Sequence, residues 1–261
     1  MNNSFLFQIS ELLIISVLFV LIIASQLIGF RVKKVQIRQN ADVKEYLGSV
    51  ENSLLGLLAL LLSFTFSMSA SKYDTRRQVI IEEVNDIGTV ILRCDLYGSN
   101  DREFLRTELK EYLEARIAYY NAGTDTEKIK AALVKSDQYS RKIWNKVSEL
   151  SHGNENIIAT QQMVPALNSM IDIVTTREAG NNAHVPDSII WLLFILTLVG
   201  GFLIGHSFKG DHINWVVVIG FSLVMVMTIF IIIDLDRPRQ GIINMDQTQS
   251  KMTELRGIFD N

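Results

Sequence analysis

One long helix is predicted over residues 53–93, which read SLLGLLALLLSFTFSMSASKYDTRRQVIIEEVNDIGTVILR. Its first part, residues 54–70, is uncharged and long enough to cross a hydrocarbon core of about 30 Å. No proline or turn signal separates this apolar part from Lys72 and the charged residues that follow. The sequence therefore predicts a helix that leaves the membrane and continues as an amphipathic helix into a soluble region.

The apolar part of this helix also carries small and hydroxyl-bearing residues at helical spacing. Small side chains let helices approach closely in lipid. The residues concerned are Gly56, Ala59, Ser63 and Ala70, together with the series Ser63, Ser67 and Ser71. Two interpretations remain open on this pattern. The helix either lines a pore, or it packs against other helices while its serines donate to carbonyl oxygens four residues earlier.

Residues 61–78, LLSFTFSMSASKYDTRRQ, resemble the signature of bestrophin membrane proteins. In that signature an apolar second membrane helix ends in a phenylalanine, a short polar segment follows, and then come Tyr-Asp-Arg and an arginine-containing turn. The matching residues are Phe66, Ser69, Ala70, Tyr73, Asp74, Arg76 and Arg77. A second match follows the last predicted span, where bestrophins carry an Asp-Pro-Phe-Gly run. The residues there are Asp236, Arg237, Pro238, Arg239, Gln240, Gly241 and Asp246.

The closer resemblance is to the bacterial family of bestrophin-like membrane proteins. Its Glu-x-Asn-x-Ile-Gly…Leu-Arg run corresponds to Glu83, Asn85, Ile87, Gly88, Leu92 and Arg93. Its second helix with an Asn…Asp…Arg series corresponds to Asn168, Asp172 and Arg177. The chain departs from true bestrophins in lacking their paired tryptophans after the tyrosine. The segment between Phe66 and Tyr73 is also one residue longer, which shifts the register of any residue carried over.

The resemblance implies an oligomeric ion channel, built as a ring of four-span subunits around the second membrane helix. Its partners would be the lipid bilayer, further copies of the chain and inorganic ions. The predicted constriction is Leu58, Leu62 and Phe66, which are spaced four apart and could gate by excluding water. Wetter parts of the pore would be lined by Ser63, Ser67 and Ser69. The alternative function is a non-conducting membrane sensor or scaffold.

Composition supports a membrane protein and gives no sign of an enzyme. Of the 261 residues 48% are hydrophobic, and the net charge of −3 argues against a nucleic-acid partner. The single cysteine, Cys94, excludes an internal disulfide framework. The sequence has no glycine-rich phosphate loop, zinc-ligand spacing or nucleophile elbow, so we predict no catalytic residues, cofactor or metal site.

The predicted fold is an all-α membrane protein with four transmembrane helices. No Lys or Arg precedes Arg31, so the first span, Phe5–Phe30, is predicted to be a retained anchor. A basic connector leads from it to the second span. The third and fourth spans are residues 187–207 and 214–233, and Gly201 and Gly205 form a Gly-x-x-x-Gly face. A helical bundle is inserted between the second and third spans, giving predicted domains 1–71, 72–186, 187–241 and 242–261.

The inserted region reads as a series of amphipathic helices. A break is predicted at residues 98–101, with Asp101 as the N-cap of the next helix. Thr124 or Asp125 is predicted to cap the helix after that, which runs to about residue 150. Pro165 lies within the last helix of the region and should either start a new segment or kink it.

Four charged residues of the bundle are predicted to meet across a helix interface. Glu83 and Asp172 could reach Arg93 and Arg177, although the pattern also allows all four to be exposed. The membrane topology cannot be read from charge, because each side offers six basic residues near the membrane. One side has Arg31, Lys33, Lys34, Arg38, Lys44 and Lys209, and the other has Lys72, Arg76, Arg77, Arg177, Arg237 and Arg239. Only the resemblance implies an inner-membrane protein whose bundle and termini are cytoplasmic.

Overall fold

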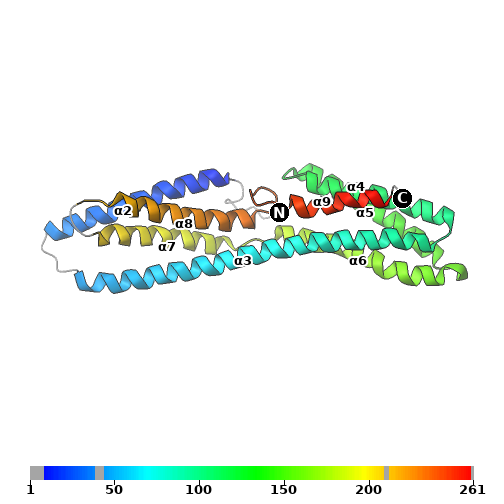
Figure 1. The fold of residues 1–261 in the computed structure, drawn as a ribbon, viewed down its shortest axis with the longest axis horizontal. Coiled ribbons are helices and arrows are strands. Elements are labelled where there is room, and N and C mark those ends of the chain that lie inside the picture. Colours follow the sequence, from blue (N-terminus) through cyan, green and yellow to red (C-terminus); the bar gives the residue numbers. More distant parts are fainter. Residues whose placement is uncertain (1–8, 39–43, 209–211, 260–261) are drawn as a thin grey trace. The chain divides into compact units, whose positions relative to one another are not determined.

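The computed structural model describes residues 9–38, 44–208 and 212–259, and in these ranges the chain forms helices and no strand (Figure 1). The helices divide into two compact units. Unit 1 takes the chain up to Tyr73 together with His184–Arg237, and unit 2 takes Asp74–Ala183 together with the chain after Arg237.

Unit 1 contains α2 (Glu11–Arg38), the first part of α3 (Lys44–Arg93), α7 (Asp187–Ser207) and α8 (Trp215–Asp236). The described chain contains four helices that are long and apolar enough to cross a membrane, as predicted. Helix α7 has the predicted bounds. Helix α8 starts after Asn214, whose side chain accepts hydrogen bonds from the N–H groups of Val216 (3.1 Å) and Val217 (3.3 Å).

The basic connector predicted after Phe30 is largely helical. Helix α2 continues through Arg38, and α3 already begins at Lys44. The physical reason is that residues 31–38 contain no proline or glycine, so the backbone hydrogen bonds of α2 continue past the apolar segment. Residues 39–43 of the predicted connector lie outside the described residues.

Close packing of α2 and α7 depends on glycines. A Cβ atom on Gly29 would lie 2.0 Å from the carbonyl oxygen of Phe202, and one on Gly205 would lie 1.9 Å from the carbonyl oxygen of Gln26. The predicted Gly201–Gly205 face therefore contacts a backbone. The buried Gln26 side chain also donates a 2.9 Å hydrogen bond to Ser222 Oγ of α8, which joins a third helix to this contact.

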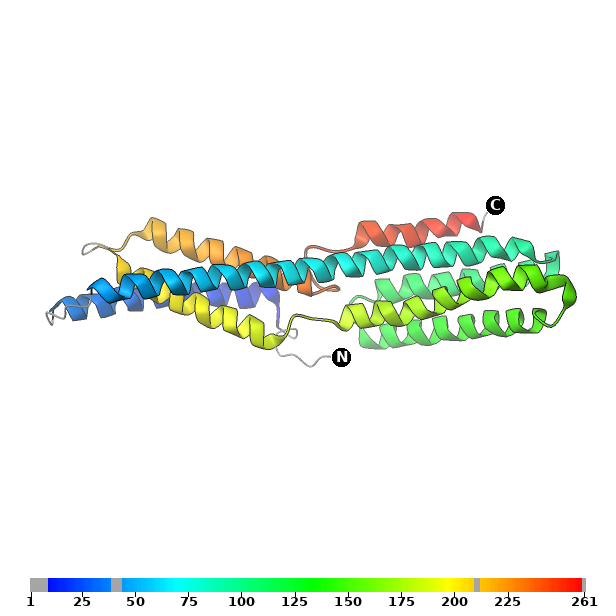
Figure 2. The ribbon, with the colours of Figure 1, turned by 90° about the horizontal axis from the view of Figure 1, so that it is seen from below.

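Helix α3 is a single element of 50 residues, and it confirms the continuous helix predicted over residues 53–93 (Figures 1 and 2). At 1.5 Å per residue it extends for about 75 Å, which is more than twice the thickness of a hydrocarbon core. Its residues up to Tyr73 belong to unit 1 and those from Asp74 belong to unit 2. The same helix therefore contributes both the second candidate span and one helix of unit 2.

Unit 2 is built from the rest of α3 and several further helices. They are η1 (Cys94–Leu96), α4 (Ser99–Asn121), α5 (Thr126–Leu150), η2 (Asn154–Asn156), α6 (Ile157–Asn182), α9 (Asp246–Glu254) and η3 (Leu255–Ile258). Asp125 caps α5 by accepting hydrogen bonds from the N–H groups of Glu127 and Lys128, both at 3.1 Å. Helix α6 continues through Pro165.

The N-cap predicted for α4 was wrong by three residues. Gly98 precedes the helix, and Asp101 lies inside its first turn. The Asp101 carboxylate is instead 3.0 Å from the Nζ atom of Lys146 on α5, so this ion pair takes the side chain away from the backbone N–H groups.

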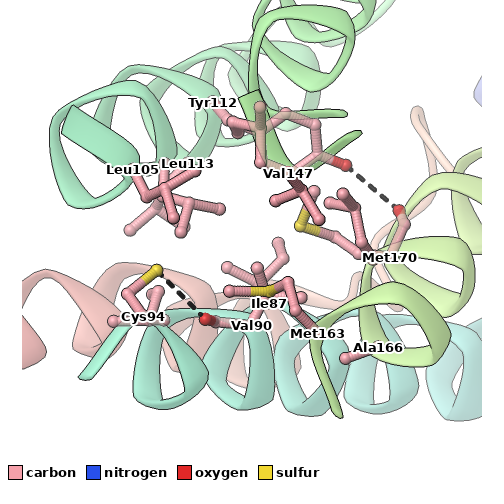
Figure 3. Close-up of a cluster of buried hydrophobic side chains, with 14 of the residues drawn as sticks. Ile87, Val90, Cys94, Leu105, Tyr112, Leu113, Val147, Met163, Ala166 and Met170 are labelled. Carbon is pink, nitrogen blue, oxygen red and sulfur yellow. Dashed lines mark hydrogen bonds between the residues drawn. The ribbon is translucent and has the colours of Figure 1, made fainter. Parts of the chain in front are cut away.

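The core of unit 2 is a cluster of buried apolar side chains from α3, α4, α5 and α6 (Figure 3). Its polar atoms are satisfied locally. Cys94 Sγ donates to the carbonyl oxygen of Val90 (3.3 Å), and the Tyr112 hydroxyl donates to that of Met170 (3.3 Å). Met252 and Leu255 join the same cluster. The segment predicted as a separate tail therefore packs within unit 2.

Candidate pore helix and buried charge cluster

The membrane part of α3 has one face that is covered by unit 1. Leu58 is 1% exposed and Leu62 is 7% exposed, and both belong to the apolar core of that unit. Thr65 and Ser69 continue the same face and are also buried. Thr65 Oγ1 donates a 2.7 Å hydrogen bond to the carbonyl oxygen of Leu61, four residues earlier. This face therefore packs against the other helices of unit 1, which is the second of the two interpretations of the sequence.

The opposite face of α3 is left uncovered by the described part of the chain. The exposed residues include the small and hydroxyl-bearing series Gly56, Ala59, Ser63, Ser67 and Ser71. A Cβ atom on Gly56 would have no atom of the described residues within 4 Å. Phe64 is 62% exposed and Phe66 is 42% exposed. Because successive helical residues are about 100° apart, these two rings lie on opposite flanks of the small series.

The residues predicted to line a pore are thus split between the two faces. Ser63, Phe66 and Ser67 are exposed, whereas Leu58, Leu62 and Ser69 face unit 1. The physical reason is helical geometry. Each step of four residues turns a side chain by about 40°, so Phe66 is rotated by about 80° from Leu58. Residues spaced four apart therefore share a face when there are two of them, as with Leu58 and Leu62, but the third residue, Phe66, lies towards the edge of that face.

A buried charge cluster in unit 2 is centred on Glu83 of α3. Its Oε1 atom accepts a 2.5 Å hydrogen bond from Arg116 Nε of α4, and its Oε2 atom accepts one from Arg177 Nη1 of α6. Arg177 Nη2 donates a 2.8 Å hydrogen bond to Gln249 Oε1 of α9. All four side chains are buried. Helices α3, α4 and α6 therefore meet at a single carboxylate, and α9 is joined to them through Arg177.

The cluster holds one carboxylate for two buried guanidinium groups. Burial is the largest influence on the pKa of Arg116 and lowers it, but the Glu83 carboxylate, Tyr112 and Tyr119 together raise this pKa above its ordinary value. Arg116 Nη1 and Nη2 are buried and have no hydrogen-bond partner among the described residues. The Arg116 guanidinium carbon lies 4.7 Å from the centre of the Tyr119 ring, which compensates part of this charge through a cation–π contact.

Tyr119 also contacts two further arginines. The guanidinium carbons of Arg177 and Arg239 lie 5.3 and 4.5 Å from its ring centre. Arg239 Nη1 donates hydrogen bonds to the carbonyl oxygens of Tyr119 (3.1 Å) and Gly123 (2.9 Å), where α4 ends. Gly123 has φ +54°, a conformation that side chains disfavour. The chain that follows α8 is thereby fixed to the end of α4.

Arg116 was not among the residues predicted from the sequence. The available signal was its position, because it follows Leu105, Leu109 and Leu113 on the apolar face of α4. Glu83 does reach Arg177, as predicted. Asp172 is exposed and forms no ion pair with any described residue, so the predicted four-residue network is not formed.

Three other predicted residues bind backbone groups of other segments. Arg76 is buried and donates to the carbonyl oxygens of Gly180 (3.0 Å) and Ala183 (2.6 Å), at the end of α6. Asp236 accepts hydrogen bonds from the N–H group of Val185, at 3.1 and 2.9 Å. Arg93 Nη1 donates to the carbonyl oxygen of Gln162.

The remaining predicted residues lie nearer the surface. Asp74, Arg77, Asn85 and Asn168 are exposed, and Tyr73, Pro238 and Gly241 are half-buried. These positions match the family pattern without entering the buried cluster, so their roles stay predictions.

The fold and these sites define a helical membrane protein with four candidate spans and a second helical unit. A family model, the Bestrophin-like domain, matches residues 16–249, and the chain belongs to this bestrophin-like family. No curated protein matches the sequence.

Solved structures show the same fold. Two crystal structures of single-residue variants of a bacterial bestrophin homolog from Klebsiella pneumoniae are similar, each at 13% identity. The first has a TM-score of 0.74 and covers 97% of this chain and 99% of its own. The second has a TM-score of 0.73 and covers 94% and 98%. A crystal structure described as a variant membrane protein matches at 12% identity, with a TM-score of 0.73 and coverage of 97% and 100%.

Proposed function

We propose that this bestrophin-like protein is an oligomeric ion channel whose pore is lined by the uncovered face of α3. The observation that carries the proposal is the exposure of the small and hydroxyl-bearing series around Ser63 and Ser67. A helix that faces only lipid gains nothing from hydroxyl groups there. Such residues suit close contact with another helix or with water in a pore. Several copies of the chain around one axis would provide both environments.

The proposed constriction is Phe66, which combines a large apolar ring with exposure beside the hydroxyl series. Leu58 and Leu62 would hold α3 in position on the side away from the pore, because they pack inside unit 1. Removing the Phe66 ring should lower the barrier that an apolar ring presents to hydrated ions. Phe64 occupies the other flank of the series, so it is the competing candidate.

Ion flux through protein reconstituted in liposomes tests this proposal. We expect Phe66→Ala to raise flux above that of the unchanged protein. Leu58→Ala is the matched control, since it also shortens an apolar side chain of the same helix. It should cost about 2–5 kcal/mol of stability without raising the flux of each folded oligomer. If Phe66→Ala and Phe64→Ala both insert correctly and both stay at the flux of empty liposomes, the pore proposal fails.

The alternative is a non-conducting sensor or scaffold. The observation that favours it is the continuity of α3, which belongs to both units without a break in its helix. A signal received by unit 2 could then reach the membrane through one element. The same liposome experiment separates the two functions, because a scaffold shows no flux with any cation or anion at any voltage.

We also propose an inner-membrane location with unit 2 and both termini in the cytoplasm. Two contacts support a common side for the ends of the spans. Arg237, just after α8, donates a 3.0 Å hydrogen bond to the carbonyl oxygen of Ile9 and lies 3.5 Å from Glu11 Oε1. The start of α2 and the end of α8 therefore meet at one end of unit 1. The choice of the cytoplasm rests on the family resemblance.

A further inference from the structure

Two adjoining open grooves lie in unit 2 beside the first half of α4. Their volumes are about 390 and 820 Å³, and both are lined by Arg102, Arg106 and Phe259. The smaller groove also contains Lys110 and the hydroxyl groups of Ser99 and Thr107, and among the described residues that line it Glu103 supplies one carboxylate. The grooves are lined by no residue of the Glu83 cluster or of the apolar part of α3.

Three cations follow one face of α4 at steps of four residues. Consecutive members of the series Arg102, Arg106 and Lys110 are about 6 Å apart along the helix axis. Arg106 is fixed, because Nη2 donates a 2.5 Å hydrogen bond to the carbonyl oxygen of Ile258 and Nη1 lies 3.5 Å from Asp95 Oδ1. The side chains of Arg102 and Lys110 form no ion pair or hydrogen bond with any described residue. Two cations on either side of a fixed arginine are thus available to a ligand.

The backbone at this end of α4 adds to the positive potential. Gly98 precedes the helix, and no side chain of the described residues caps the N–H groups of its first turn. Asp101 lies in that turn, but its carboxylate pairs with Lys146 at 3.0 Å. Unpaired N–H groups at a helix start favour anions. The charge, the hydroxyl groups and the helix start therefore all point to an anionic ligand.

We propose that the smaller groove, which contains Arg102, Arg106 and Lys110, binds a small anion that carries two or more phosphate groups. Arginine matches phosphate oxygens with paired N–H donors, and lysine contributes a point charge. A series about 12 Å long suits an extended anion better than a single halide ion. Phe259 offers an apolar surface next to the cations, and its ring centre is 5.8 Å from the Arg106 guanidinium carbon. Inorganic pyrophosphate and a nucleoside diphosphate share the required chemistry.

Titration calorimetry of the full chain in detergent, at constant ionic strength, tests the site with inorganic pyrophosphate. We expect saturable binding of one anion for each chain. The double variant Arg102→Gln with Lys110→Gln should weaken the affinity at least tenfold. Both side chains are exposed, so its melting temperature should equal that of the unchanged protein.

The matched control is Lys128→Gln with Lys130→Gln, which removes the same charge from exposed lysines at the start of α5. It should change the affinity less than twofold. An absence of saturable heat overturns the proposal, and so does an equal loss of affinity in both double variants, because that result indicates general charge attraction. Neither measurement depends on ion conduction.

Adenosine diphosphate distinguishes the two sources of phosphate. If adenosine diphosphate binds more tightly than pyrophosphate and Phe259→Ala removes this gain in affinity, the ligand is a nucleotide. Equal affinities that Phe259→Ala leaves unchanged assign the free phosphate compound. Adenosine diphosphate that fails to compete with bound pyrophosphate contradicts a shared phosphate site in this groove.

Discussion

At the scale of single residues, Glu83 has the most exacting environment in unit 2. Its two carboxylate oxygens compensate Arg116 and Arg177, and all three side chains are buried. Removing one partner of a buried ion pair leaves the other charge uncompensated, which costs about 3–5 kcal/mol. The carboxylate is more critical than either arginine, because its loss leaves two uncompensated cations.

We therefore predict that Glu83→Gln lowers the melting temperature of the purified protein. A cost of about 3–5 kcal/mol corresponds to a shift of roughly 6–20 °C in a protein of this size. Asp172→Asn is the control, since it also neutralises one carboxylate but at an exposed position, and it should change stability by less than about 0.5 kcal/mol. Equal melting temperatures for the Glu83 variant and the unchanged protein would contradict a buried, charged cluster.

This cluster also shows how far residue-level prediction extends. Glu83 and Arg177 were identified because they match a family pattern. Arg116 occupies a position where the α4 pattern requires an apolar residue, and that departure was a readable signal of a buried charge. Its partner could not be read, because pairing depends on how α3, α4 and α6 meet. Asp172 was placed wrongly for the same reason.

At the scale of helices, sequence predicted existence and continuity better than orientation. Helix α3 contains no proline, and its apolar segment leads directly into an amphipathic one, so one element was expected and is observed. Which face of its apolar segment is buried was not predictable, because leucines occur all round it. Leu58 and Leu62 therefore looked equivalent to the exposed Leu57 and Leu60.

The contact between α2 and α7 gives a prediction at this scale. We expect Gly205→Ala to destabilise the protein, because the new Cβ atom would lie 1.9 Å from the carbonyl oxygen of Gln26 and backbone atoms cannot rotate away. The helices must separate, at a cost of about 3 kcal/mol or more. Thermal unfolding in detergent should show a decrease of roughly 6–12 °C.

Gly220→Ala makes the same chemical change in α8, where a Cβ atom would have no atom of the described chain within 4 Å. It should leave the melting temperature unchanged or raise it slightly, because alanine has a higher helix propensity than glycine. If both variants melt together with the unchanged protein, the close approach of α2 and α7 is not required for stability.

At the scale of the whole molecule, the four spans and the helical class were predictable from hydropathy. The packing of the C-terminal segment within unit 2 was not predictable. Met245, Gln249, Met252 and Leu255 bury one face of α9 and η3 at steps of three and four residues. That pattern is too short to be distinguished from chance in a sequence. Its docking partner could only be identified once the helices of unit 2 were placed.

Because this segment packs in unit 2, the turn at His152 and the chain end after α9 are expected on the same side of the membrane. Cysteine labelling in intact cells measures this directly. The native thiol gives little background, since Cys94 is completely buried. We predict that His152→Cys and Gly257→Cys react with a membrane-impermeant maleimide only after the cells are permeabilised. His212→Cys, before α8, should react in intact cells, because that connection lies at the other end of the spans.

The three positions are exposed, so access depends on the membrane alone. Labelling of residues 152 and 257 from outside, with residue 212 protected, would place unit 2 outside the cytoplasm. The basic residues near the membrane divide equally between its two sides, so their charge does not decide the orientation and this measurement does.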